Sequence, residues 1–264
     1  LNDNVIYNTQ LTNASGDYTF DAPVGGNYMT VASQPGYDFH PPTSPQWLNL
    51  TANQSQDFTG TLIPYDLTGQ VTNLLASAPH NHQAVIRLYE VGNPTPIASV
   101  NTLAGTENYT FGATKIYVNK QYTVGVAPFP GYTFTPSSVT INNPVGNQSA
   151  NFVAIRTNFT IKGRVYGVDY SNPNLTGEKV KLECPGSVEN EVYVNGDGSE
   201  EYTFTVLAFG TYTVTPSMDG HNFVYKTTTS PTHTYTNISA SVAGEDYNAS
   251  IKTFTISGRV VDDN

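Results

Sequence analysis

The sequence predicts an all-β protein built from tandem β-sandwich domains. The main observation is a short strand pattern around a glycine, which occurs three times along the 264 residues. The three copies are Tyr65–Val71, Phe159–Val165 and Thr253–Val260. Their glycines are separated by 163 − 69 = 94 and 258 − 163 = 95 residues. A period of this size exceeds the unit of a solenoid and is typical of an array of whole domains.

Composition is the second observation. The chain contains 17 Pro, 18 Tyr and 12 Phe, and no long stretch carries apolar residues at helical spacing. Aromatic residues favour strands that are half buried and half wetted. We therefore expect helix to be a minor component at most.

The third observation is a shared order of strands downstream of each glycine pattern. A first aromatic strand is expected at Asp17–Phe20, Asn108–Phe111 and Glu201–Phe204. A second follows at Tyr28–Val31, Tyr122–Val124 and Tyr212–Val214, and then a glycine with an aromatic pair at Gly36–Phe39, Gly131–Phe134 and Gly220–Phe223. The last strand carries an aromatic residue eleven positions before the next glycine pattern, at Phe58, Phe152 and Tyr247. The turn residues Asn13–Gly16 and Asn195–Gly198, each before a first aromatic strand, are typical of hairpins.

Two further strands lie upstream of the first aromatic strand in the later copies only. They are Ala84–Tyr89 and Ile97–Val100 in one copy, and Val180–Cys184 and Glu191–Val194 in the next. The first copy begins at Asn4–Tyr7, which aligns with the later of the two, so it lacks its opening strand and its second strand. About seven short strands per copy indicate sandwiches of immunoglobulin-like or transthyretin-like topology.

These patterns predict four segments. Residues 1–64 form an incomplete sandwich, 65–158 a second sandwich, 159–252 a third, and 253–264 an opening strand with no domain behind it. In this last segment Phe254, Ile256 and Val260 fall on one face of the strand at period two.

The repeated motifs resemble those of two related families. Gly131-Tyr132-Thr133-Phe134-Thr135-Pro136 and Gly210-Thr211-Tyr212-Thr213-Val214 are the clearest examples. They are similar to carboxypeptidase-regulatory-like domains and to collagen-adhesin B-type domains of secreted microbial surface proteins. The resemblance implies an extracellular or cell-surface location and a role as stalk or spacer. Some B-type domains form a Lys–Asn isopeptide bond, but the candidate Lys162 is expected to face outward, so we expect no such bond here.

Charge and composition exclude several classes of protein. The formal net charge is −10 and no Lys/Arg cluster exists to neutralise phosphates, which argues against nucleic acid as a partner. No stretch of about 18 apolar residues is present, so no membrane span is expected. The single Cys184 excludes an intrachain disulfide network and is expected to be a small buried hydrophobe.

Candidate modification sites are more numerous than candidate chemical sites. Nine Asn-x-Ser/Thr sequons are candidates for N-linked glycans: Asn13, Asn49, Asn53, Asn108, Asn147, Asn158, Asn174, Asn237 and Asn248. His80 and His82 have a spacing that can hold zinc, but no third ligand is near, so loop histidines are expected. Asn195–Gly198 with Glu200 and Glu201 lacks the alternating acids of a calcium loop. We expect no metal, no cofactor and no catalytic site, because no nucleophile–base arrangement or phosphate loop is recognisable.

The first hypothesis for the function is a structural subunit of an extracellular filament or stalk. An incomplete sandwich exposes unpaired backbone groups and invites another strand. Phe254, Ile256 and Val260 of one molecule can enter the first domain of the next, which is donor-strand complementation and gives an open head-to-tail polymer of copies of the chain. A covalent tandem array would present the same ends. The alternative is an adhesin or carbohydrate-binding accessory module, for which Trp47 and the Tyr225–Tyr235 region are the candidate aromatic surfaces.

Overall fold

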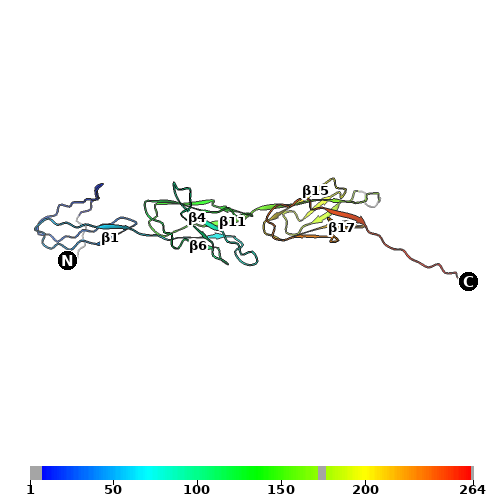
Figure 1. The fold of residues 1–264 in the computed structure, drawn as a ribbon, viewed down its shortest axis with the longest axis horizontal. Helices are drawn as coiled ribbons and strands as arrows, with labels where there is room; N and C mark the ends of the chain where they lie inside the picture. The colour runs from blue at the N-terminus through cyan, green and yellow to red at the C-terminus, as the bar shows by residue number, and fades with distance from the viewer. Residues whose placement is uncertain (1–7, 172–176, 263–264) are drawn as a thin grey trace.

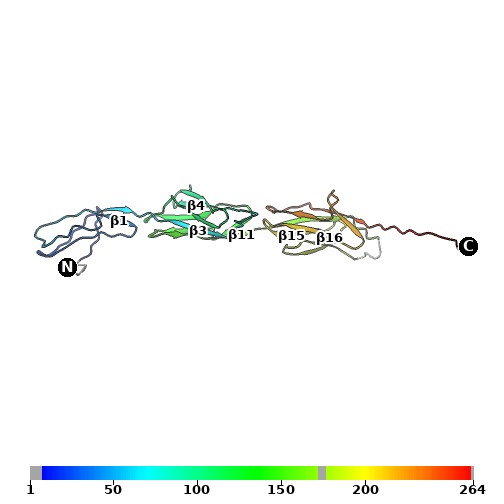
Figure 2. The same cartoon turned by 90° about the horizontal axis from the view of Figure 1, so that it is seen from below.

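The computed structural model of the protein describes residues 8–171 and 177–262. Three units follow one another along the long axis, and the C-terminal segment extends beyond the third (Figure 1, Figure 2). We refer to residues 8–64, 65–157 and 158–252 as the first, second and third units, and to 253–262 as the C-terminal segment.

The second unit consists of two sheets. One sheet contains β3 (Leu67–Thr72), β6 (Asn108–Thr110), β8 (Tyr132–Thr135), β10 (Gln148–Ser149) and β11 (Phe152–Arg156). The other has the order β5-β4-β7-β9. These strands are β4 (Val85–Glu90), β5 (Ala98–Asn101), β7 (Gln121–Val126) and β9 (Ser138–Asn142).

The third unit repeats this arrangement. One sheet has the order β15-β12-β19-β17 and the other β14-β13-β16-β18. The strands of the first sheet are β12 (Asn158–Tyr166), β15 (Glu201–Leu207), β17 (His221–Tyr225) and β19 (Tyr247–Ile251). The strands of the second sheet are β13 (Val180–Glu183), β14 (Glu191–Val194), β16 (Tyr212–Ser217) and β18 (His233–Tyr235).

Each of these two units has a core filled from both sheets. In the third unit Ile161 and Val165 of β12 and Leu182 of β13 are fully buried in one cluster. Inward residues alternate with outward ones along β12, where Lys162 is partly exposed and Arg164 exposed, as the period-two pattern predicts. The predicted all-β class with tandem β-sandwiches is confirmed, although the second and third units contain nine and eight described strands, compared with the expected seven or so.

The opening strand occupies an interior position in its sheet. In the third unit β12 pairs antiparallel with β15 on one side and parallel with β19 on the other. In the second unit β3 pairs in the same way, with β6 on one side and with β10 and β11 on the other. A unit without its opening strand therefore has a gap inside the sheet, flanked by two strands.

The expected hairpin at Asn195–Gly198 is wrong. β14, which precedes these residues, pairs with β13, whereas β15, which follows them, pairs with β12 in the other sheet. The turn therefore connects the two sheets. Gly196 and Gly198 both have positive φ values, 77° and 81°, so they provide the sharp reversal that such a crossing shares with a hairpin.

The first unit contains far less regular structure than the sequence predicts. Its described strands are β1 (Tyr37–His40) and β2 (Thr59–Leu62), which pair antiparallel. The expected strand Asp17–Phe20 has no ladder, because its counterparts β6 and β15 bind the opening strand, which the described first unit lacks. The expected strand Tyr28–Val31 is reduced to one bridge between Tyr28 and Trp47.

We predict that Gly163→Ala destabilises the third unit by about 3 kcal/mol, because the added methyl group would overlap the backbone carbonyl of Glu245. Denaturant unfolding of the full chain measures the loss. Gly146→Ala is the matched control, since no atom lies within 4 Å of its added methyl, and a change within about 0.5 kcal/mol is expected. Equal effects of the two substitutions would contradict this account of Gly163.

Candidate assembly interface

The position that holds an opening strand has a recurring polar contact at its centre. In the second unit the Tyr109 hydroxyl donates to the backbone carbonyl of Ala150, which lies on the other side of β3. In the third unit the Tyr202 hydroxyl donates to the carbonyl of Glu245 in the same way. Each tyrosine ring thus lies across the opening strand and joins its two neighbours.

The strand glycines are required by this contact. Gly69 is the ladder partner of Tyr109, and Gly163 is the partner of Tyr202. A Cβ atom at Gly69 would overlap both the Ala150 carbonyl oxygen and the Tyr109 hydroxyl. Only glycine allows the strand to pass so close to the tyrosine, which covers the bare backbone in return.

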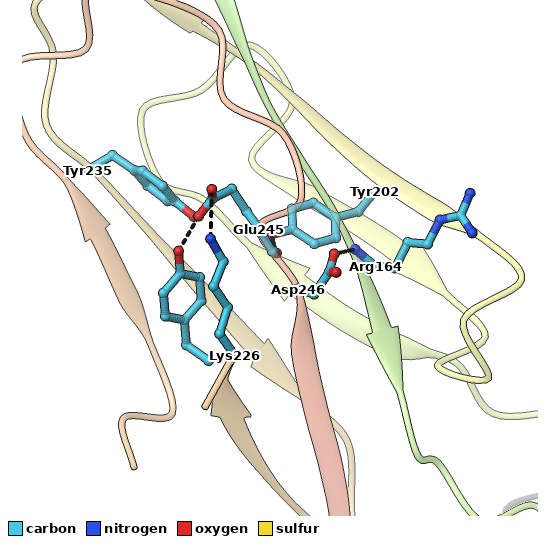
Figure 3. Close-up of polar contacts among 7 residues, drawn as sticks. Arg164, Tyr202, Lys226, Tyr235, Glu245 and Asp246 are labelled. Atoms are coloured by element: carbon cyan, nitrogen blue, oxygen red, sulfur yellow. Dashed lines mark hydrogen bonds and ion pairs between the residues drawn. The ribbon is translucent and has the colours of Figure 1, made fainter. Parts of the chain in front are cut away.

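A side-chain acceptor fixes the residue after each glycine. In the second unit the Gln70 amide donates to Asn151 Oδ1 at 3.0 Å. In the third unit the Arg164 amide donates to Asp246 Oδ1 at 2.9 Å (Figure 3). A second acceptor in the second unit is Asn147, whose Oδ1 receives the Asp66 amide at 2.9 Å. These contacts set the register of the opening strand.

The first unit carries the same groups without a strand among them. The Tyr18 hydroxyl donates to the Gln56 carbonyl at 2.6 Å, the counterpart of the two contacts above. Asp57 occupies the place of Asn151 and Asp246, and Asn53 that of Asn147; both are exposed. We call this arrangement of Tyr18, Asn53, Gln56 and Asp57 the strand slot.

The aromatic side chains beside the strand slot are less buried than their counterparts in the other two units. None of the large apolar side chains of the described first unit is buried. Tyr18, Phe20, Tyr28 and Phe58 are half-buried, whereas their counterparts in the other two units are each at most 6% exposed. The aromatic core of the first unit therefore lacks part of its cover.

The C-terminal segment has the reverse problem. Phe254, Ile256 and Val260 are 86%, 99% and 100% exposed. The counterparts of Ile256 and Val260, which are Ile161 and Val165, are fully buried, and Phe159, the counterpart of Phe254, is half-buried. All described residues from Lys252 onward are exposed and belong to no sheet. The segment runs outward from the third unit as a single extended chain (Figure 1). Among the described residues, the apolar C-terminal segment thus pairs with no sheet, and no strand of the first unit lies at the position that β3 and β12 occupy in the other units.

The other candidate sites form no chemical centre in the part of the chain that is described. No group of three or more His, Cys, Asp or Glu side chains is arranged as metal ligands there. His80 and His82 lie 5.4 Å apart between ring centroids, and His82 packs edge-on against Phe209 of the third unit. Burial, and then the neighbouring His80, lower the pKa of His82. The histidines therefore belong to the packing between two units.

The remaining residues singled out by the sequence are structural. Cys184 is fully buried, as expected. Glu200 accepts from both the amide and the side chain of Asn195, so it stabilises the turn. The described part of the chain has no apolar helix of membrane-spanning length.

The aromatic residues considered for ligand binding do not form an exposed cluster. Tyr225 and Tyr235 are only 7% and 8% exposed. Trp47 is half-buried and exchanges two backbone hydrogen bonds with Tyr28. Tyr225 and Tyr235 therefore do not supply the exposed aromatic surface that the alternative hypothesis requires, because these rings face the interior.

Sequence reasoning missed the reason why these tyrosines point inward. Glu245 is 8% exposed, and its carboxylate accepts hydrogen bonds from Tyr225, from Tyr235 at 2.9 Å and from Lys226 at 3.1 Å (Figure 3). Burial raises the pKa of Glu245, but these donors outweigh it and hold the pKa below its ordinary value. The only signal in the sequence was the pair of tyrosines that the other copies lack.

The eight described sequon asparagines share an exposed position: Asn13, Asn49, Asn53, Asn108, Asn147, Asn158, Asn237 and Asn248. Asn174 lies outside the described residues. Exposure leaves these side chains accessible, and whether they carry glycans stays a prediction.

Comparisons with known proteins support the fold. No protein-family model matches the sequence, and no curated protein matches it. Among solved structures, the chain is similar to the TIE protein of Bacillus anthracis, with a TM-score of 0.51 and 13% identity over 86% of this chain. The match covers 42% of that protein, so the chain spans less than half of its length.

Weaker similarities involve pilins. A streptococcal ancillary pilin matches with a TM-score of 0.27 and 16% identity, over 70% of this chain and 62% of the pilin. The shaft pilin SpaA of Lactobacillus rhamnosus GG matches with a TM-score of 0.25 and 12% identity, over 74% of this chain and all of the pilin. The surface-protein families named from the sequence are not identified by these comparisons.

We predict that acidification destabilises the third unit through Glu245. A carboxylate whose pKa is lowered by folding stabilises the native state above its unfolded pKa, and this contribution is lost as the pH falls through the folded value. Unfolding free energies between about pH 6 and pH 3 should therefore decrease less in Glu245→Gln than in the native chain, while at neutral pH the variant should be less stable by about 1–3 kcal/mol. Glu178→Gln, at an exposed position, is the control and should retain the native pH dependence. An unchanged pH dependence in Glu245→Gln would contradict the prediction.

Proposed function

We propose that the chain is a structural subunit of an extracellular surface filament or stalk. The supporting observation is that, among the described residues, no strand lies in the strand slot, and the C-terminal segment, whose sequence matches an opening strand, pairs with none. The linear order of the three units (Figure 2) and the likeness to the TIE protein fold fit such a role. In this proposal the β-sandwiches provide reach and no unit performs catalysis.

The proposed joint between subunits is the insertion of the C-terminal segment of one chain into the strand slot of the next. By analogy with Gly163 on Tyr202, Gly258 would lie on Tyr18, above its bond to Gln56. The Arg259 amide would then donate to Asp57, as Arg164 does to Asp246. Ile256 would pair beside Phe20 and Val260 beside Phe58, following the registers of β12 with β15 and β19.

The expected gain comes mainly from apolar burial. Full burial of a Val, Ile or Phe side chain stabilises by roughly 1.5–3 kcal/mol, and the inserted strand also satisfies backbone groups on both of its edges. A joint of this kind extends indefinitely, because each end differs from the other and the contact does not close.

A covalent version of the same arrangement is a second form of this proposal. In a tandem array, an opening strand from residues preceding Leu1 would fill the strand slot. The two forms share their contacts and differ in the number of polypeptides. The C-terminal segment supplies one of the two strands that the first unit is expected to lack.

We also propose that several sequons carry N-linked glycans. All described sequon asparagines are exposed, and a glycan coat would supply solubility to a chain with only 12% charged residues. Deglycosylation of native material, followed by mass measurement, should remove mass in excess of the bare 28.6 kDa. Material whose mass does not change would contradict the glycan proposal alone.

The strand-insertion proposal predicts that a valine at one position of the C-terminal segment abolishes assembly, whereas a valine at the neighbouring position leaves assembly unchanged. Gly258→Val should abolish assembly of the full chain, because its side chain would meet Tyr18 and the Gln56 carbonyl. Ser257→Val is the matched control: it adds similar bulk on the outward face and should assemble normally. After the chains are refolded together from denaturant, light scattering measures the oligomers.

Boiling in denaturant separates the two forms of the proposal. Strand-inserted oligomers should dissociate to chains near 28.6 kDa, whereas native material that stays as one much larger polypeptide would indicate a covalent array. Refolded chains that remain monomeric, or Gly258→Val chains that assemble as well as the native ones, would contradict strand insertion.

A further inference from the structure

Each unit has a loop at one end that connects the first aromatic strand to the second. We call it the tip loop. Its central residue is Val24, Val118 or Ala208, and the next residue has a positive φ, of 81° at Gly25, 61° at Asn119 and 62° at Phe209. The amide of that next residue donates to the same neighbouring loop in every unit: Gly25 to Leu50 O at 2.8 Å, Asn119 to Asn143 Oδ1 at 2.7 Å and Phe209 to Ile238 O at 2.6 Å. The three tip loops therefore have the same backbone conformation and the same kind of hydrogen bond at this residue.

At both internal junctions the tip loop packs on a glycine of the preceding unit. Val118 of the second unit lies against Gly36 so closely that a Cβ atom there would overlap it. Phe209 of the third unit lies in the same way against Gly131. A polar contact accompanies the first junction, where Asn119 Nδ2 donates to the Tyr37 hydroxyl at 3.3 Å.

Aromatic packing accompanies the second junction. The Phe209 ring lies 4.5 Å from the ring of His82 and 5.0 Å from that of Tyr132, between centroids. Ala208 and Phe209 are both part of the core cluster of the second unit. The tip loops of the second and third units thus each close the end of the unit before it.

The backbone that leaves each unit starts with the same hydrogen bond. The residue after the last strand donates to the carbonyl of the receiving glycine: Ile63 to Gly36 at 2.9 Å, Thr157 to Gly131 at 3.0 Å and Lys252 to Gly220 at 2.8 Å. The glycine of the next opening strand follows this residue by six positions in all three cases, since 69 − 63 = 163 − 157 = 258 − 252 = 6. A strand inserted from the C-terminal segment would therefore bring the next first unit to the distance found at the internal junctions.

Both halves of such a junction are present and exposed. Val118 and Ala208 are 3% and 0% exposed, whereas Val24 is 80% exposed. Gly36 and Gly131 are buried, whereas Gly220 is exposed. The tip loop of the first unit and the glycine at the end of the third unit thus lack the contacts that their counterparts make.

We infer that the end of the third unit around Gly220 binds the Val24 tip loop of a second copy of this chain. This contact rests on the proposed strand insertion and adds a second site to it. The inserted strand alone is a single tether, about which the two units can rotate. The tip loop fixes their orientation, so the filament continues with the same junction that the chain contains twice.

The test is disulfide crosslinking across the junction in the full chain. Val24→Cys combined with Asp219→Cys places one thiol on the exposed tip loop and one beside Gly220. After refolding and mild oxidation, we expect oligomers that are covalently linked on non-reducing denaturing gels. Cys184 is fully buried and does not compete.

Two controls accompany the crosslink. Val118→Cys with Pro35→Cys occupies the equivalent positions of the first internal junction and should form a disulfide within one chain. Adding Gly258→Val to the Val24→Cys, Asp219→Cys chain should remove both the oligomers and the crosslink. A further variant, Val24→Asp, should weaken association by on the order of tenfold, the loss expected when burial of one valine is replaced by a charge.

The outcomes separate this inference from the proposed function. Oligomers that assemble without forming the crosslink, and that Val24→Asp does not weaken, would overturn tip-loop docking and leave strand insertion intact. Native-sequence chains that form no oligomers would overturn strand insertion, and docking with it. Crosslinked oligomers together with weaker association of Val24→Asp support the inference.

Discussion

The hydrogen bond from a tyrosine hydroxyl across the opening strand is the contact on which the sandwiches depend. It ties together the two strands that flank the opening strand and forces that strand to carry glycine where it passes the ring. Because Gly69 and Gly163 both have this neighbour, the glycine that marks the repeat in the sequence has a structural cause. The burial of the aromatic core follows, since Tyr109 and Tyr202 are almost fully enclosed once the strand is in place.

The first unit shows that this contact forms without an opening strand. Tyr18 reaches Gln56 at 2.6 Å, so the two segments that carry these residues are already joined by the hydrogen bond of one tyrosine. A preformed site loses less conformational freedom when it is filled than one that must first be ordered. The half-buried rings beside it are the cost of keeping the site open, and they also supply the apolar surface that an entering strand would cover.

Much of the fold could be predicted from the sequence. The alternation of buried and exposed residues can be read from a single strand, and the spacing of the glycines can be read from the repeat as a whole. Sheet membership was harder: the residues at Asn195–Gly198 suit a hairpin and a crossing equally well, and long-range pairing decides between them. Glu245 was missed because Glu245 and Asp246 stand side by side in a polar segment, and nothing there singles out Glu245 until the fold brings Tyr225 and Tyr235 beside it. The likeness of the tip loops was hidden by length, since Phe111 and Tyr122 are three positions further apart than Phe20 and Tyr28.

The parallel pairing of the first and last strands of the second and third units determines how the chain would carry tension. A pull along the rod enters a unit through its opening strand and leaves through its last strand, and β12 and β19 lie side by side in the same direction. The pull acts on the N-terminal end of β12 and on the C-terminal end of β19, which lie at opposite ends of the ladder. The force is therefore directed along the strands and roughly perpendicular to the hydrogen bonds between them. Such loading is in shear, so the bonds must break together and cannot open one at a time like a zipper. A strand inserted at Tyr18 in the same register would inherit this geometry, and a joint between two molecules would then resist extension in the same way as a unit within one molecule.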